Sequence, residues 1–159
     1  MTKELSNELD KPWASLNFNG YRILEINYNY NINTEEHDYT ETEVSIGVRF
    51  NLDLESEEKK AEIDLKAEIF PDYVKYSKPF CLSVIMRGYF TVEITEDRKK
   101  AKQLLARNAV AILFPYLRSA ITSITAEAGI KPFILPPVNI VKLLEDKNKN
   151  RLETKQMKG

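Results

Sequence analysis

The side chains best suited to covalent or acid–base chemistry are scarce in this chain. Its single histidine, His37, lies in the acidic run 35–38, and its single cysteine is Cys81. A catalytic histidine needs a nucleophile or a second acid held against it, and a nucleophilic cysteine generally needs a nearby cation or helix N-terminus. The sequence shows neither partner beside these two residues. We therefore interpret His37 as a solvated loop residue, and we expect no catalytic residue and no enzyme activity.

The residues that usually form metal and cofactor sites are also scarce. With one histidine and one cysteine, the chain cannot form a zinc site of the usual kind by itself. Its five glycines form no phosphate-binding loop. We expect no metal ion and no cofactor. The lone cysteine cannot form an intramolecular disulfide, which is typical of a cytoplasmic protein.

The composition predicts one soluble domain. A chain of 159 residues is long enough to bury a single hydrophobic core. A net charge of -1 and a pI near 6.0 give no basic surface, so we expect no nucleic-acid binding. We identify no apolar run of 18 residues and no hydrophobic leader after Met1. We therefore expect neither membrane insertion nor a secretory signal.

The most distinctive residues are prolines set among aromatic and aliphatic side chains in the second half. Residues 113–118 (LFPYLR) lie inside a helical pattern, where a proline costs about 3 kcal/mol. They predict a kinked helix whose freed backbone groups are covered by packing. Residues 135–140 (LPPVNI) predict a rigid extended segment that leads into a short last helix at about 138–146.

Four strands are predicted by apolar and polar residues that alternate with period two. They occupy about 16–32, 44–54, 61–69 and 80–94. Gly20, Tyr21 and Ile23 interrupt the alternation of the first strand, which predicts a bulge or bend at its middle. Short polar connections favour an antiparallel meander.

One long helical region follows the strands. Thr95 with the two acids after it is a typical helix start. The helical pattern continues to Ala106, breaks or bends near Asn108, and resumes as far as Ala128, where Gly129 ends it. The element order predicts an α+β fold, with a four-stranded antiparallel sheet and both helices packed on one of its faces.

The chain divides into three parts on the same pattern. Residues 1–13 form a flexible N-terminal arm, residues 14–146 form the folded domain, and residues 147–159 form a charged tail that we expect to be disordered.

Two kinds of binding surface are predicted. Apolar side chains on the loop 71–78, the extended segment and the last helix predict a groove, and exposed apolar grooves typically mark partner sites. From the residues alone, groove lining and core packing remain alternatives. The candidate groove residues are Tyr73, Tyr76, Phe133, Leu135, Val138, Ile140, Leu143 and Leu144.

The polar face of the predicted sheet carries eight acids against three bases. It is either a solvated face or a docking surface for a basic partner. The docking candidates are Glu25, Asp53, Glu55, Glu62, Asp64 and Glu68. The apolar helix exposes more surface than one sheet can cover, which predicts an oligomer. Its candidate oligomerisation residues are Ile112, Leu113, Leu117, Ile121 and Ile124.

Residues 112–118 and 135–140 resemble the C-terminal half of the SecB family of bacterial export chaperones. That family pairs an ILFPYAR-like helix with an L-x-P-V-N-F-like entry to its last helix. The order of elements matches from about Ala14 to Asp146, and the sequence matches from about Asn108 to Leu144. The resemblance implies a homotetramer, built as a dimer of dimers, that lacks ATPase activity and binds unfolded precursor polypeptides in apolar grooves. It also implies delivery to the motor protein SecA, which docks on an acidic sheet face.

The sequence alone does not identify the client polypeptide. The tail is basic where the family's C-terminal end contacts SecA. Some SecB-like chaperones protect an antitoxin of a toxin–antitoxin pair instead of general preproteins. Two further classes are a carrier of lipid or another hydrophobic ligand, which would co-purify with a small molecule, and an oligomerisation module, which would not bind unfolded chains.

Overall fold

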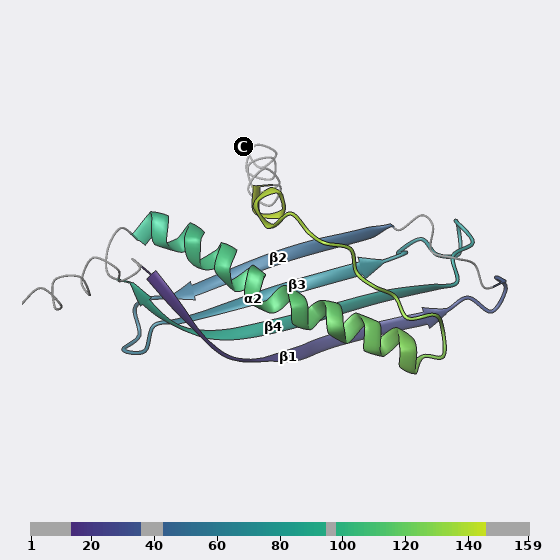
Figure 1. The fold of residues 1–159 in the computed structure, drawn as a ribbon, viewed down its shortest axis with the longest axis horizontal. Coiled ribbons are helices and arrows are strands. Elements are labelled where there is room, and N and C mark those ends of the chain that lie inside the picture. Colours follow the sequence, from purple (N-terminus) through teal and green to yellow (C-terminus); the bar gives the residue numbers. More distant parts are fainter. Residues whose placement is uncertain (1–13, 36–42, 95–97, 146–159) are drawn as a thin grey trace, which may run out of the picture.

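Four antiparallel strands form one sheet, and a long helix crosses one of its faces (Figure 1). The structure is a computed structural model that describes residues 14–35, 43–94 and 98–145. The predicted arm 1–13, the tail 147–159, His37 and the predicted helix start at Thr95 lie outside these ranges. The elements are β1 (Ala14–Tyr30), β2 (Val44–Asp53), β3 (Lys60–Ile69), β4 (Phe80–Ile94) and α2 (Arg98–Glu127).

The strand order in the sheet is β1-β4-β3-β2. Strands β2, β3 and β4 form the predicted meander, but β1 pairs with β4 and not with β2. Thirteen residues, 31–43, separate β1 from β2. A connection of that length can pass from one edge of the sheet to the other, which a short hairpin cannot. The antiparallel α+β class is confirmed, and the meander is corrected at β1.

The interrupted pattern of β1 corresponds to two bulges. Asn19 and Leu24 have no partner in β4, so the register of the two strands shifts at both positions. Between the shifts, Tyr21 and Ile23 face the same side as the buried residues of β4. After the second shift the even-numbered residues return to that side, starting with Ile26. The prediction of a bulge in this strand is confirmed. The presence of two bulges was not predicted.

The core lies between the sheet and α2. Alternate residues of β3 and β4 are buried on the face toward the helix, as their alternation predicts. The helix contributes buried residues at every fourth position. Because an α-helix has 3.6 residues per turn, a stripe with period four moves around the helix along its length. These helix residues are Ala101, Leu105, Ala109, Leu113, Leu117, Ile121 and Thr125.

Helix α2 is continuous over 30 residues, so of the break or bend predicted near Asn108 the break does not occur. Pro115 lies inside it, on the exposed face. Because the proline has no amide proton, the carbonyl four residues earlier loses its helical partner, and that residue, Ala111, is also exposed. Solvent can therefore satisfy the freed carbonyl, which corrects the expectation that packing covers it.

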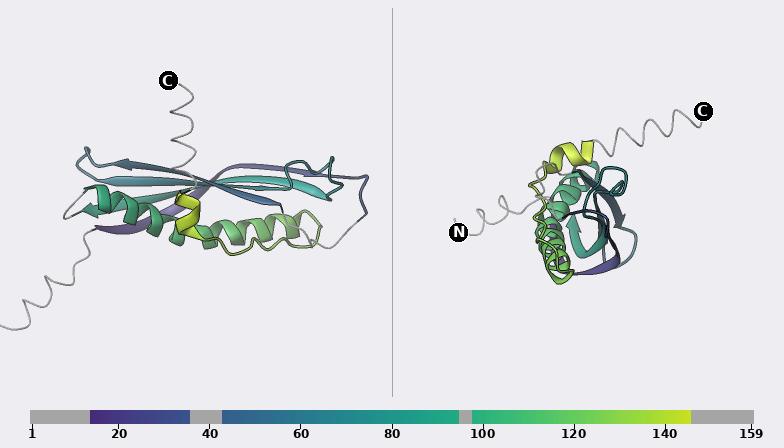
Figure 2. Two further views of the ribbon diagram at one scale, coloured as in Figure 1. Left: turned by 90° about the horizontal axis from the view of Figure 1, so that it is seen from above. Right: turned by 90° about the vertical axis from the view of Figure 1, so that its right-hand side faces the viewer.

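The helix ends as predicted at Gly129, whose φ is +80°. The amide of Gly129 donates to the carbonyl of Ala126, and the amide of Ile130 donates to the carbonyl of Thr125. This pair of bonds is the Schellman motif. It turns the chain back, so that the extended segment 131–139 leads to a short helix at 140–145. Figure 2 shows this segment running on the α2 side of the sheet, which confirms that both helices lie on one face.

The apolar character of α2 was underestimated from the sequence. Ala101–Glu127 is long and apolar enough to cross a membrane by length and composition alone, although core helices of soluble proteins pass the same test. In this fold one side of the helix packs on β1, β3 and β4. Its place in the core accounts for the apolar residues on that side of the helix.

Candidate binding surfaces

The structure divides the predicted groove residues into two groups. Phe133 and Leu135 are fully buried and belong to the core, so they cannot contact a partner as placed here, which corrects their assignment. An extended segment sends alternate side chains to opposite sides, and these two point inward while Ile134 between them is 65% exposed. The remaining residues are accessible. Tyr76 is exposed and Val138 is half-buried, and Tyr73, Ile140, Leu143 and Leu144 are half-buried against the core.

An aromatic cluster explains why Phe133 is buried. Its ring lies 6.1 Å from the ring of Phe70 and 6.2 Å from that of Phe80, both in edge-to-face orientation. Phe70 and Phe80 are themselves 5.4 Å apart. The three rings join the end of β3, the start of β4 and the extended segment. These ring contacts hold the extended segment against the sheet beside α2.

The loop between β3 and β4 projects apolar and aromatic side chains from a fixed base. Phe70 and Ser77 both have positive φ values, of 50° and 51°. Non-glycine residues in this region are uncommon, and they persist where surrounding contacts hold them. Asn31 supplies one such contact, because its side-chain amide donates to the carbonyl of Lys78. Val74 and Tyr76 are held exposed on this loop.

Strand β2 adds a row of apolar side chains on the same face of the sheet. They are half-buried and pack against the core. Among the described residues, no strand pairs with the outer edge of β2. The alternation over 44–54 predicts one apolar face for this strand, but it does not show that the face stays accessible. They are Val44, Ile46, Val48, Phe50, Leu52 and Leu54.

The predicted oligomerisation residues are mostly core residues. Leu113, Leu117 and Ile121 are fully buried against the sheet within one chain, which corrects their assignment, and Ile112 and Ile124 are half-buried. The period-four stripe explains this, because it places these three on the sheet side of α2. Another apolar surface remains open along β1 and the adjoining side of α2, where the rings of Tyr21 and Tyr116 lie 5.1 Å apart. Its exposed members are Tyr21, Ile23, Leu24, Ile26, Tyr30, Leu104 and Tyr116.

The acidic face of the sheet is partly neutralised by its own bases. The Arg87 guanidinium binds both carboxylate oxygens of Asp64, at 2.6 and 2.9 Å, and lies 3.5 Å from Glu62. Lys66 Nζ lies 2.5 Å from Glu68. These contacts raise the pKa of Arg87, chiefly through the hydrogen bond to Asp64, and the pKa of Lys66, chiefly through the hydrogen bond to Glu68.

Three of the six docking candidates, Glu25, Asp53 and Glu55, form no ion pair with another described residue. The carboxylate of Asp53 accepts bonds from the backbone amides of Glu55 and Ser56, which lower its pKa. Asp53 and Glu55 therefore place negative charge at the β2–β3 turn. Glu25 instead lies near the centre of the face, across Ile85 from Lys66, whose pKa its charge helps to raise, so the centre of the face is balanced.

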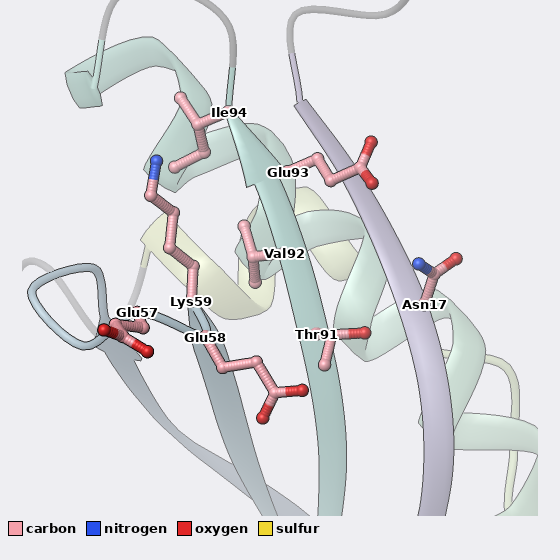
Figure 3. A pocket seen from close by; sticks show the side chains of 8 residues that line it. All are labelled: Asn17, Glu57, Glu58, Lys59, Thr91, Val92, Glu93 and Ile94. Carbon is pink, nitrogen blue, oxygen red and sulfur yellow. The ribbon is translucent and has the colours of Figure 1, made fainter.

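Two hollows lie outside the predicted groove and docking residues. One, of about 430 Å³, wraps the end of the sheet at the β2–β3 turn (Figure 3). It is lined by Asn17, Glu57, Glu58, Lys59, Thr91, Val92, Glu93 and Ile94. Among the described residues, no group of histidine, cysteine and acidic side chains is arranged to hold a metal ion. The other, of about 370 Å³, lies on the exposed side of α2 around Pro115 and Arg118.

Comparison with known proteins points to one family. Residues 25–151 match the family model described as preprotein translocase subunit SecB. An uncharacterized protein of Methanocaldococcus jannaschii is 47% identical over 73 residues, which are 46% of this chain and 45% of that protein. The protein-export protein SecB of Anaplasma phagocytophilum is 33% identical over 60 residues, which are 36% of this chain and 38% of that protein. The alignments thus span less than half of these two relatives.

A solved structure shares the fold at low sequence identity. It is a SecB-like chaperone of Mycobacterium tuberculosis in complex with a ChAD peptide from the HigA1 antitoxin. It aligns with a TM-score of 0.58 and 11% identity, over 78% of this chain and 88% of that chain. The sheet order and the helix layer described above are therefore those of a known fold.

Proposed function

This chain belongs to the SecB family, and from that premise we propose that it is an ATP-independent chaperone that holds unfolded polypeptides on apolar surface. It would act in the cytoplasm, without enzyme activity, and keep preproteins competent for export by SecA. The observation that carries the proposal is the apolar surface left open by a fold whose core is otherwise complete. Apolar surface that a fold leaves open typically marks sites for other polypeptides.

The proposed client surface has three parts on the α2 side of the sheet. They are the half-buried row of β2, the loop residues Tyr73, Val74 and Tyr76, and the apolar residues of the extended segment and last helix. Burial of apolar area is non-directional, so many sequences can bind such a surface. Its aliphatic and aromatic side chains suit unfolded chains better than any one folded partner.

A dedicated antitoxin client is the second candidate. The specific observation in its favour is the shared fold with a SecB-like chaperone that was solved with an antitoxin peptide. The partial balance of charge on the sheet face also reduces the support for a docked SecA, because Arg87 and Lys66 neutralise acids at its centre. Genes for a toxin and an antitoxin beside this one would favour the antitoxin client.

We also propose a homotetramer, arranged as a dimer of dimers. The exposed apolar residues of β1 and Tyr116 support an interface between copies, in place of the buried helix residues first considered. Light scattering at micromolar concentration tests this, and a monomer would contradict it.

Client holding is tested by the suppression of aggregation when a slow-folding enzyme is diluted from denaturant. We expect protection without nucleotide, and its loss when Leu143 and Leu144 are both replaced by Asp. The matched control adds the same two charges as Ser45→Asp with Asn51→Asp, on the opposite face of β2. Equal protection by both double variants would place the client surface elsewhere, and an inactive wild-type protein would contradict the holding function.

The two clients are separated by binding measurements at low and high salt. Docking of SecA through exposed acids should weaken as salt screens the charges. No binding of SecA at low salt, together with tight binding of an antitoxin peptide, would reverse the order of the two candidates.

A further inference from the structure

Both backbone groups of Phe133 are bonded to threonine side chains of α2. The amide of Phe133 donates to Oγ1 of Thr125 at 2.8 Å. Its carbonyl accepts from Oγ1 of Thr122 at 2.9 Å. The two threonines are three positions apart, so they lie on one side of the helix, about one turn from each other. Together they bind one residue of the extended segment as a neighbouring strand would.

We call Thr122 and Thr125 the threonine clip. The hydroxyl of Thr125 is buried and both donates and accepts a hydrogen bond. Thr125 is fully buried, and its hydroxyl also donates within the helix, to the carbonyl of Ile121 at 2.9 Å. Its own carbonyl accepts the amide of Ile130 in the helix-ending motif. Thr125 therefore fixes the segment at both Ile130 and Phe133.

The clip sets which side chains of the segment face outward. With Phe133 held against the helix, Phe133 and Leu135 point into the core, and Ile134 points away with 65% of its surface exposed. A shift of the segment by one residue would exchange these sides. It would bury Ile134 and bring Phe133 or Leu135 to the surface.

We propose that Thr122 and Thr125 are positioning residues of the client surface, and that they present Ile134 as its apolar contact on the extended segment. The inference rests on the proposed binding of unfolded polypeptides. Three observations support it: the paired bonds to one residue, the full burial of Thr125, and a large apolar side chain held in solvent between two buried neighbours. The occupant is an aliphatic or aromatic side chain of an unfolded client.

Ile134 is tested by Ile134→Ser, with Ile32→Ser as the matched control. Ile32 has the same side chain, is 84% exposed and lies in the turn after β1. The probe is fluorescently labelled, reduced and carboxymethylated α-lactalbumin, which stays unfolded. We expect Ile134→Ser to raise the Kd about fivefold, the effect of losing part of one apolar side-chain contact. We expect Ile32→Ser to bind like the wild type.

The clip is tested by Thr125→Val and Thr122→Val, with Thr125→Ser as the conservative variant that keeps the hydroxyl. Hydrogen exchange at the Phe133 amide reports the clip directly, at a temperature where each variant is folded. We expect faster exchange in Thr125→Val and near wild-type exchange in Thr125→Ser. If the bound register is then populated only about one fifth of the time, the apparent Kd rises about fivefold. Thr122→Val removes the bond to the Phe133 carbonyl, together with the bond to the Arg118 carbonyl within the helix, and leaves the bond to the Phe133 amide in place. It keeps the test available if Thr125→Val does not fold.

The outcomes separate this inference from the proposed function. If Ile134→Ser binds the probe like the wild type, Ile134 is not a client contact. If Thr125→Val exchanges faster but binds equally well, the clip stabilises the fold without positioning the surface. A wild-type protein that does not bind the probe contradicts the proposed function itself.

Discussion

Leu113 of α2 occupies the space that a side chain at Gly88 of β4 would need. A Cβ atom built on Gly88 would lie 3.2 Å from both Leu113 methyl carbons and 3.0 Å from the Phe90 ring. The helix therefore approaches the sheet closely at this point, two residues before Pro115. Gly88 is required here for its lack of a side chain, since its φ is not in the left-handed region.

We predict that Gly88→Ala destabilises the protein by about 1–3 kcal/mol, because an extra methyl in a packed core forces neighbours apart. Urea unfolding measures the loss. The control is Gly47→Ala in β2, where the nearest atom to the new Cβ is Lys66 Cβ at an ordinary 3.9 Å. A loss no larger for Gly88→Ala than for Gly47→Ala would mean that the helix can move away at little cost.

Gly129→Ala should cost about 1 kcal/mol for a different reason. No atom lies within 4 Å of the position that its Cβ would take, so the cost comes only from a φ of +80°. Asparagine tolerates this region better than alanine. We therefore expect Gly129→Asn to lose less stability than Gly129→Ala in the same urea experiment. The reverse order would show that steric contact, and not backbone conformation, limits this position.

The pair Arg87–Asp64 should contribute about 0.5–1 kcal/mol, since it is bidentate but partly exposed. A double-mutant cycle with Arg87→Met and Asp64→Asn measures this coupling. Arg87→Lys should recover only part of it, because an ammonium group cannot bind both carboxylate oxygens in the same plane. A coupling that is unchanged at 1 M salt would contradict a solvent-screened pair.

Because of Asp53, the free energy of unfolding should depend on pH in the acid range. Two backbone amides favour its charged form, so its pKa in the folded protein lies below the ordinary value of 3.8. The unfolded chain then takes up the proton first. The stabilisation is complete above about pH 4, declines as the pH falls through the folded pKa, and is absent below it. Asp53→Asn should remove this part of the pH dependence, and NMR titration of the carboxyl carbon gives the shifted pKa directly.

The sequence predicted the elements well where burial on one face repeats with a fixed period. The alternation of β3, from Ala61 to Ile69, is confirmed residue by residue, and Gly129 ends the helix as its type implies. The order of the strands was harder to predict, because the alternation of β1 is compatible with pairing to β2 or to β4. Only the length of 31–43, which is too long for a short hairpin, favours pairing of β1 with β4.

The site was predicted less well than the fold because exposure depends on contacts between distant segments. The sequence predicts Phe133 as a groove residue, because a proline-rich segment after the main helix is expected to lie at the periphery of the fold. Its burial depends on Phe70 and Phe80, which are more than 50 residues away in the chain. The helix residues Leu113 and Leu117 show the same effect. Their apolar character was evident, but whether they face the sheet or another copy is decided by the path of the helix.

The two bulges of β1 have a consequence for how far the sheet can grow. β2 pairs with β3 over ten residues without a shift, so its outer edge is regular, whereas the outer edge of β1 is interrupted twice. Bulges twist an edge away from further strands, and a regular edge can accept them. Edge-to-edge addition between copies of this chain is therefore limited to one side and stops after a single pairing. Removal of Asn19 and Leu24 would leave 15 residues opposite the 15 of β4, which makes both edges regular. A chain shortened in this way could add copies at both edges and polymerise into fibres.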